Sequence, residues 1–155
     1  MLKYIHLFTD GSVNTKTKVG LGAILITNEL EWPVNSKVLL KEFNNTSSTT
    51  LEIQILLWAL RQIEDQRNVK VYTDSQNTLS LIERKTRLIK NDFKSKTGKE
   101  LNNAALYRKF YSETERLNIQ LYKVKGHNKS INKDLIAQIF GIVDKESRKA
   151  LRQLN

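Results

Sequence analysis

Residues 3–12 read Lys-Tyr-Ile-His-Leu-Phe-Thr-Asp-Gly-Ser, and residues 68–76 read Asn-Val-Lys-Val-Tyr-Thr-Asp-Ser-Gln. Each stretch is rich in β-branched and aromatic side chains and ends in Thr-Asp followed by a turn residue, so each predicts a strand closed by an acid. If the two strands are parallel neighbours, Asp10 and Asp74 lie side by side at one edge of the sheet. This repeated ending fixes both the expected fold class and the expected place of the chemistry.

The rest of the chain supplies further elements around this pair. Hydrophobic periodicity predicts strands over residues 19–27, 36–43 and 118–124, and helices over about 51–64, 76–83, 101–115 and 134–151. The order predicts an α/β fold, a mixed five-stranded sheet with helices on both faces. No internal repeat or linker is visible, so residues 1–155 are expected to form a single domain.

Size and composition exclude several classes of protein. The chain has 155 residues, 39% hydrophobic and 27% charged, which indicates a domain that buries a core rather than a disordered segment. It contains no cysteine, which excludes disulfides, thiolate zinc sites and a cysteine nucleophile and favours a cytoplasmic location. The longest apolar run, residues 55–60, is too short to span a membrane, and the first residues lack the pattern of a signal peptide.

The charge of the chain indicates a polyanionic partner. Twenty-six Lys and Arg face 16 Asp and Glu, a formal net charge of +10, and nucleic acid is the leading candidate. More than half of the excess lies in residues 84–99, where seven cations stand against one carboxylate. A single cluster of this kind is typical of a solvated face. Two more occur, so phosphate binding is favoured: Lys123, Lys125, Lys129 and Lys133, and Lys145, Arg148, Lys149 and Arg152.

Three carboxylates are candidates for a metal site. Asp10 and Asp74 close two strands, and Glu52 falls near the start of the helix expected after the polar residues 44–50. Taken singly, each aspartate is typical of a turn, and the glutamate of a helix N-terminus. Taken together, they would repel one another and raise one another's pKa unless a divalent cation lay between them. Oxygen ligands alone favour magnesium or manganese over zinc.

Four motifs in order resemble those of the type 1 ribonuclease H family. They are Phe-Thr-Asp-Gly-Ser at 8–12, Thr-Leu-Glu at 50–52, Val-Tyr-Thr-Asp-Ser-Gln at 71–76 and Val-Lys-Gly-His at 124–127, with the basic stretch between the last two. The resemblance covers nearly the whole chain. It implies the ribonuclease H-like fold and an endoribonuclease that hydrolyses the RNA strand of RNA–DNA hybrids, leaving 5′-phosphate and 3′-hydroxyl ends. Two Mg²⁺ ions, or Mn²⁺, would be held by Asp10, Glu52, Asp74 and a fourth carboxylate.

The fourth carboxylate is the point where the chain departs from the common family pattern. The usual Asn-Glu-x-Ala-Asp string is absent after His127, and the usual spacing lands near Ala137, which cannot bind metal. Two candidates remain, Asp134 and Asp144. We prefer Asp144, because an acid in mid-helix is costly unless it is used, whereas Asp134 is explained as a helix N-cap.

The resemblance also implies roles for residues outside the carboxylates. His127 would transfer a proton or assist product release, whereas His6, inside the first strand, is expected to be packed. Contacts to 2′-hydroxyls of the RNA are expected from Gly11, Ser12, Ser48 and Thr49, with the last two in place of the family's Asn-Asn pair. Asn103, with Thr46 or Ser47, would help bind a phosphate of the DNA strand. The basic protrusion, residues 84–99, would grip the hybrid through Arg84, Lys85, Arg87, Lys90, Lys94 and Lys96.

Two other functions are compatible with the same motifs. One is a non-catalytic module that binds RNA–DNA hybrids, and the displaced fourth carboxylate is the feature that would favour it. The other is a different two-metal nuclease of the same superfold, such as a junction resolvase or an integrase-like domain, against which Gly11-Ser12 and Gly126-His127 argue. Because no second domain accompanies the motifs, we expect a free-standing monomer.

Overall fold

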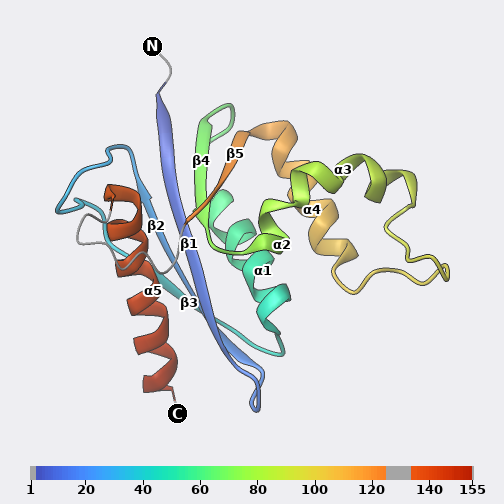
Figure 1. The fold of residues 1–155 in the computed structure, drawn as a ribbon, viewed down its shortest axis with the longest axis horizontal. Coiled ribbons are helices and arrows are strands. Elements are labelled where there is room, and N and C mark those ends of the chain that lie inside the picture. Colours follow the sequence, from blue (N-terminus) through green and yellow to red (C-terminus); the bar gives the residue numbers. More distant parts are fainter. Residues whose placement is uncertain (1–2, 125–133, 155) are drawn as a thin grey trace.

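The computed structural model describes residues 3–124 and 134–154 and contains one mixed sheet (Figure 1). The strand order is β3-β2-β1-β4-β5, with β1–β2 and β2–β3 antiparallel and β1–β4 and β4–β5 parallel. This confirms the predicted fold class. The strands are β1 (Tyr4–Asn14), β2 (Val19–Thr27), β3 (Leu39–Phe43), β4 (Asn68–Thr73) and β5 (Asn118–Lys123).

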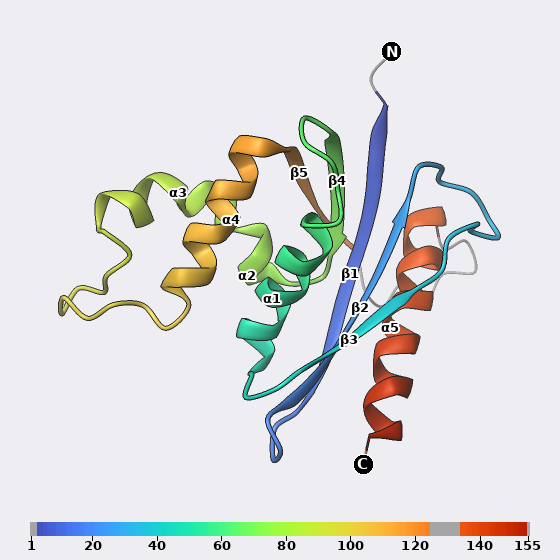
Figure 2. The ribbon, with the colours of Figure 1, turned by 180° about the vertical axis from the view of Figure 1, so that it is seen from behind.

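The helices lie on both faces of this sheet. The long C-terminal helix covers one face of β1 and β2, and the others gather on the opposite side (Figures 1 and 2). No helix among the described residues is long and apolar enough to cross a membrane. The helices are α1 (Ser48–Leu60), α2 (Gln76–Leu79), α3 (Leu81–Lys90), α4 (Ala104–Arg116) and α5 (Leu135–Gln153).

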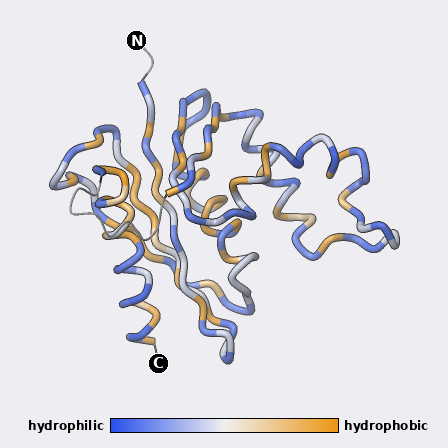
Figure 3. The backbone as a smooth tube through the Cα atoms, in the orientation of Figure 1, coloured by the Kyte–Doolittle hydropathy of each residue, from blue (hydrophilic) through white to orange (hydrophobic). Residues whose placement is uncertain are grey.

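The alternation of side chains along the strands gives the sheet two hydrophobic cores. Leu7 points to the side of α1 and α4, whereas Phe8 points to the side of α5, and both are fully buried. Colouring by hydropathy shows the consequence, since apolar residues concentrate in the central strands and α1 while the link between α3 and α4 is largely polar (Figure 3).

The first strand is longer than its sequence indicates. The Asp-Gly-Ser signal predicts a turn at residues 10–12, but β1 continues to Asn14, paired with β2 through Gly11↔Gly22. A Cβ at Gly11 would lie 2.5 Å from Ile55 Cδ1 and 2.9 Å from Leu51 Cδ2 of α1. Gly11 is therefore needed for the close approach of a helix rather than for a turn, and Asp10 lies inside a strand, not at its end.

Other boundaries differ from prediction for local reasons. Helix α1 begins at Ser48 because the Ser47 side chain accepts a hydrogen bond from the Thr50 N–H, and it ends at Leu60 rather than near residue 64. The helix predicted at residues 76–83 is divided at Ser80, and its second part extends to Lys90. Much of the basic protrusion is therefore helical. Strand β3 begins at Leu39 rather than at residue 36, and helix α4 begins at Ala104 rather than at residue 101. Strands β2 and β4 have the predicted bounds.

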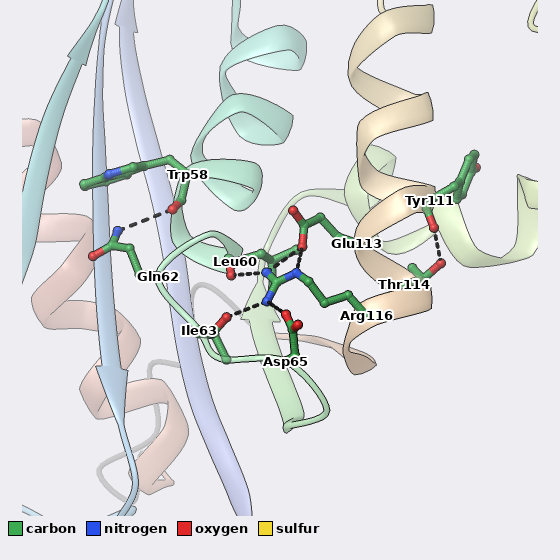
Figure 4. Close-up of polar contacts among 9 residues, drawn as sticks. All are labelled: Trp58, Leu60, Gln62, Ile63, Asp65, Tyr111, Glu113, Thr114 and Arg116. Carbon is green, nitrogen blue, oxygen red and sulfur yellow. Dashed lines mark hydrogen bonds and ion pairs between the residues drawn. The ribbon is translucent and has the colours of Figure 1, made fainter.

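Arg116 joins the C-terminal end of α1 to the end of α4 (Figure 4). Its guanidinium donates to the carbonyl oxygens of Leu60 (2.8 Å) and Ile63 (2.6 Å) and pairs with the carboxylates of Asp65 (3.0 Å) and Glu113 (2.6 Å). Carbonyls at a helix C-terminus lack intrahelical partners, so this side chain supplies donors that the helix itself cannot provide.

Replacing Arg116 by Ala is therefore expected to lower the free energy of unfolding by about 2 kcal/mol, since the hydrogen bonds from a charged donor to the Leu60 and Ile63 carbonyls are lost. For a domain of this size the melting temperature should fall by about 4–8 °C, measurable by calorimetry. Lys94→Ala is the control, because its ion pair with Asp92 is exposed and should contribute less than about 1 kcal/mol. Equal effects of the two substitutions would contradict this account of Arg116.

Candidate active site

Two strands bring Asp10 and Asp74 to the same place. The parallel pairing of β1 with β4 ends at Phe8↔Tyr72, so each aspartate stands two residues beyond the last pair. β4 ends at Thr73, whereas β1 runs on beside β2, so the other edge of the last part of β1 has no strand neighbour within the described ranges. The expectation of neighbouring carboxylates at one edge of the sheet is thus met, although only Asp74 follows a strand end.

Helix α1 brings Glu52 to the same edge. Leu51 and Ile55, which flank Glu52 in the sequence, are the residues that lie against Gly11. Since the helix starts at Ser48, Glu52 lies beyond its first turn, and no acid stands in that turn. The interpretation of Glu52 as an acid that stabilises the helix N-terminus is therefore wrong. One oxygen each of Asp10, Glu52 and Asp74 lies within 4.8 Å of the others, a spacing that suits a shared cation.

The last helix supplies a fourth carboxylate. Alternation along β1 places Asp10 and Ser12 on the side of α5, and the Ser12 and Ser147 hydroxyls are 3.1 Å apart. Asp144 lies one helical turn before Ser147 and forms a side-chain hydrogen bond with Asp10. Asp134, the other candidate, caps the N-terminus of α5, where its carboxylate accepts from the Ala137 N–H at 2.7 Å.

Burial and mutual repulsion dominate the electrostatics of Asp10 and Glu52 in this cluster. Asp10 is only 4% exposed; burial, the hydrogen bond with Asp144 and the charges of its acidic neighbours raise its pKa strongly. Burial, and then the charge of Asp74, raise the pKa of Glu52 to about 8. One Glu52 oxygen, Oε2, is buried and has no hydrogen-bond partner among the residues that the structure describes. A cation would satisfy that oxygen and favour the ionised form of every member.

Two residues position the carboxylates without having been predicted to do so: Ser147 was not considered, and Arg148 was expected only as part of a basic cluster. Ser147 is fully buried, and its hydroxyl donates to the Asp144 carbonyl at 3.0 Å, so it fixes α5 against β1 beside the cluster. Arg148 pairs with the Asp144 carboxylate at 3.0 Å. Only the second leaves a signal in the sequence, because acid and base stand four residues apart on a helix.

The residues expected at the RNA and DNA strands lie near the start of α1. Ser48 and Thr49 are exposed in its first turn, and Gly11 offers only backbone groups. Asn103 accepts a hydrogen bond from the Thr50 hydroxyl at 2.9 Å. Thr46 is buried and donates to Gln54 at 2.8 Å, which leaves Ser47 as the exposed hydroxyl of the pair considered for a DNA phosphate.

The cations of the basic protrusion divide into two groups. Arg84 donates to the Asn77 carbonyl (3.1 Å) and amide oxygen (3.0 Å) and lies over the Tyr107 ring, and Lys85 lies over Tyr111. These two therefore have partners within the fold. The others are exposed, namely Arg87, Lys90, Lys94 and Lys96.

The two histidines have different outcomes. His6 is half-buried, and its Nδ1 lies 2.9 Å from the Tyr72 hydroxyl, in accord with a packed residue. His127 lies outside the described residues, so its role stays a prediction.

Comparison with known proteins places this geometry among relatives. A family model described as RNase H matches residues 3–138. The chain is 30% identical over 132 residues to a ribonuclease H of Haemophilus influenzae (82% of this chain, 80% of that one) and 28% identical over 144 residues to ribonuclease HI of Pasteurella multocida (90% and 88%). A foamy viral protease–reverse transcriptase solved with an RNA/DNA hybrid shares the fold, with a TM-score of 0.67 at 13% identity, covering 95% of this chain and 19% of the viral one.

Proposed function

The chain belongs to the RNase H family, and from that premise we propose that Asp10, Glu52, Asp74 and Asp144 hold the metal ions with which it hydrolyses RNA. It is a ribonuclease H, a metal-dependent endonuclease acting on the RNA strand of RNA–DNA hybrids. The observation that carries the site assignment is the convergence of three carboxylates within 4.8 Å, with Asp144 hydrogen-bonded to the most buried of them.

The residues present fit two divalent cations, Mg²⁺ or Mn²⁺. All four side chains offer only oxygen ligands, and Oε2 of Glu52, which has no hydrogen-bond partner in the described part of the chain, is a ligand atom that a cation would satisfy. Bound there, the ions would lower the pKa of the attacking water and stabilise charge on the phosphate and on the leaving 3′-oxygen. No side-chain nucleophile is required, and the products would carry 5′-phosphate and 3′-hydroxyl ends.

The protein's own contribution is to fix the acids before substrate arrives. Asp10 is held by a strand and Glu52 by a helix packed on Gly11, so neither needs to reorganise. Arg148 holds the Asp144 carboxylate from the solvent side while Ser147 fixes its backbone. A rigid cluster of this kind positions the scissile phosphate by geometry rather than by covalent chemistry.

We assign recognition of the hybrid to the surface around the start of α1. Backbone groups of Gly11 and the hydroxyls of Ser48 and Thr49 would contact 2′-hydroxyls of the RNA, with Ser12 next to them, although its hydroxyl already contacts Ser147. Ser47 and Asn103 would bind a phosphate of the DNA strand. The exposed cations of the protrusion would add salt-dependent affinity without reading sequence.

The non-catalytic alternative is disfavoured by the position of Asp144. The feature in favour of that alternative is that neither acid after His127 has the common family spacing, and a missing ligand would impair metal binding. The contact between Asp144 and Asp10 supports a complete set of four. The cytoplasmic location and the monomeric state stay predictions.

The decisive experiment is cleavage of an end-labelled RNA–DNA hybrid in Mg²⁺, beside duplex DNA and duplex RNA of the same sequence. We expect cutting of the RNA strand of the hybrid alone, stopped by EDTA and restored by added Mg²⁺ or Mn²⁺. Hybrid binding that weakens steeply with salt, with no cleavage in either metal, would instead identify a binding module.

A further inference from the structure

A ladder of aromatic rings crosses the face of the sheet that carries α5. Tyr72 on β4 stacks against Phe8 (centroids 4.6 Å apart) and His6 (5.9 Å) on β1 and against Tyr122 (5.8 Å) on β5, with interplanar angles of 20–25°. The hydrogen bond between His6 and the Tyr72 hydroxyl fixes two of these rings. None of them has a part in the metal site.

The ladder ends in an open ring on an edge strand. Tyr122 is 42% exposed, and among residues 3–124 and 134–154 no strand pairs with the outer edge of β5. Its hydroxyl donates to the Gln120 side chain at 2.7 Å, which restrains the ring. A planar group could therefore stack on Tyr122 and extend the ladder by one step, at little conformational cost to the protein.

A cavity of about 420 Å³ adjoins this ring, with a cation beside it. Tyr72, Tyr122 and Lys70 line it from the strands, and Asp134, Ile136 and Ala137 line it from the start of α5. The Lys70 ammonium lies 4.2 Å from the Tyr4 ring centroid and 5.9 Å from that of Tyr122. Asp134 is the one acid among these residues, and it is engaged in capping α5.

We propose that this aromatic platform, Lys70, Tyr72 and Tyr122, binds the first unpaired nucleotide of a single-stranded extension of the hybrid. The base would stack on Tyr122 and its phosphate would pair with Lys70, the combination of ring and cation that binds single strands without sequence preference. A purely apolar peptide would gain nothing from Lys70, and the overall charge of +10 favours an anionic ligand.

Part of the platform lies on β4, the strand that Asp74 follows. Tyr72 precedes Asp74 by two residues, which is about 7 Å along a strand and close to the span of one nucleotide. Tyr122 is the register partner of Tyr72 on the neighbouring strand. A strand that leaves the metal site on the side of α5 would therefore meet Tyr122. The inference rests on the proposed function, since it concerns the same substrate.

The test compares a blunt hybrid with hybrids carrying a few unpaired nucleotides at each of the four strand ends in turn. The readout is the ratio of kcat/KM for the extended over the blunt substrate, in wild type, Tyr122→Ala, Tyr122→Phe and Lys70→Gln. Wild type should prefer at least one extended substrate by about tenfold, the size expected for one stacked base. Tyr122→Ala should bring the ratio close to one, Tyr122→Phe should retain it, and Lys70→Gln should reduce both the ratio and its salt dependence.

Failure of this inference can be told apart from failure of the proposed function. A wild-type ratio near one at all four ends, with the blunt hybrid cut normally, would overturn the platform and leave the enzyme intact, as would a ratio that Tyr122→Ala leaves unchanged. If no hybrid is cut, the affinity for a labelled single-stranded oligonucleotide, measured by fluorescence anisotropy, still decides. Tyr122→Ala must weaken it about tenfold, and Tyr122→Phe must not, for the platform to stand.

Discussion

Asp10→Asn is expected to lower the rate of hybrid cleavage by about 1,000-fold or more while the fold and hybrid binding persist. The substitution keeps the shape of the side chain and removes a charged oxygen from the most enclosed position of the cluster, 4% exposed beside Glu52, Asp74 and Asp144. Loss of a metal-dependent charge stabilisation of several kcal/mol corresponds to a rate effect of this order. Single-turnover cleavage at saturating enzyme measures the rate of the cleavage step without a contribution from substrate binding.

The same substitution should make the metal-free protein more stable above neutral pH. Burial, the hydrogen bond with Asp144 and neighbouring charges raise the pKa of Asp10, and burial raises that of Glu52 to about 8. An acid with a folded pKa above its unfolded value holds its proton in the folded state after the unfolded chain has released it. Stability is therefore present below the unfolded pKa, near 4, and is lost as the pH rises toward the folded pKa, near 8 for Glu52.

Thermal unfolding in EDTA at pH 5 and pH 8 tests this sign. From pH 5 to pH 8, wild type should lose more stability than Asp10→Asn does. At pH 8 the variant should be more stable than wild type by about 1–3 kcal/mol. Mg²⁺ should raise the wild-type melting temperature at pH 8 by mass action and raise that of the variant less. Asp92→Asn, an exposed acid, is the control. If Asp10→Asn is less stable than wild type in EDTA at pH 8, then repulsion between Asp10 and its acidic neighbours does not destabilise the metal-free protein.

The sequence predicts the parts of this fold that depend on a local repeat. β2 and β4 are found at the predicted residues because apolar side chains alternate or run without interruption between polar ends. The rule that parallel strands bring their carboxyl ends to one edge was enough to place Asp10 near Asp74. Asp134 as a helix cap also follows from local chemistry alone.

The rest depends on contacts distant in the sequence. The sequence predicts a turn at Asp10-Gly11, but these residues pair with β2, and Leu51 packs on Gly11. The contact of Ser12 with Ser147 joins residues 135 positions apart, and no pattern in either segment indicates it. The contacts of Arg84 with the Asn77 carbonyl and the Tyr107 ring likewise depend on how α2 and α4 pack, which the sequence pattern does not indicate.

Asp144→Asn is expected to lower cleavage by about 100-fold, whereas Asp134→Asn should leave it within about twofold of wild type. A carboxylate ligand at a more open position than Asp10 supports a smaller effect, because solvent can replace part of its charge. Asparagine caps a helix about as well as aspartate, so Asp134→Asn should preserve the bond to the Ala137 N–H and the stability of α5. Both substitutions replace an aspartate of the same segment by asparagine, so a difference between them reports on metal binding rather than on the chemistry of the replacement.

Stability and metal dependence separate a ligand from a structural acid at position 144. The Asp144–Arg148 pair is exposed, so its loss should change the free energy of unfolding by less than about 1 kcal/mol. A weakened ligand set should demand a higher Mg²⁺ concentration for half-maximal cleavage, a shift that Arg148→Gln, which keeps the Asp144 carboxylate, should produce only in part. Full activity of Asp144→Asn at low Mg²⁺, or inactivity of a folded Asp134→Asn, would contradict the assignment of Asp144 as the fourth ligand. The contact between Asp144 and Asp10 would then contribute to packing alone.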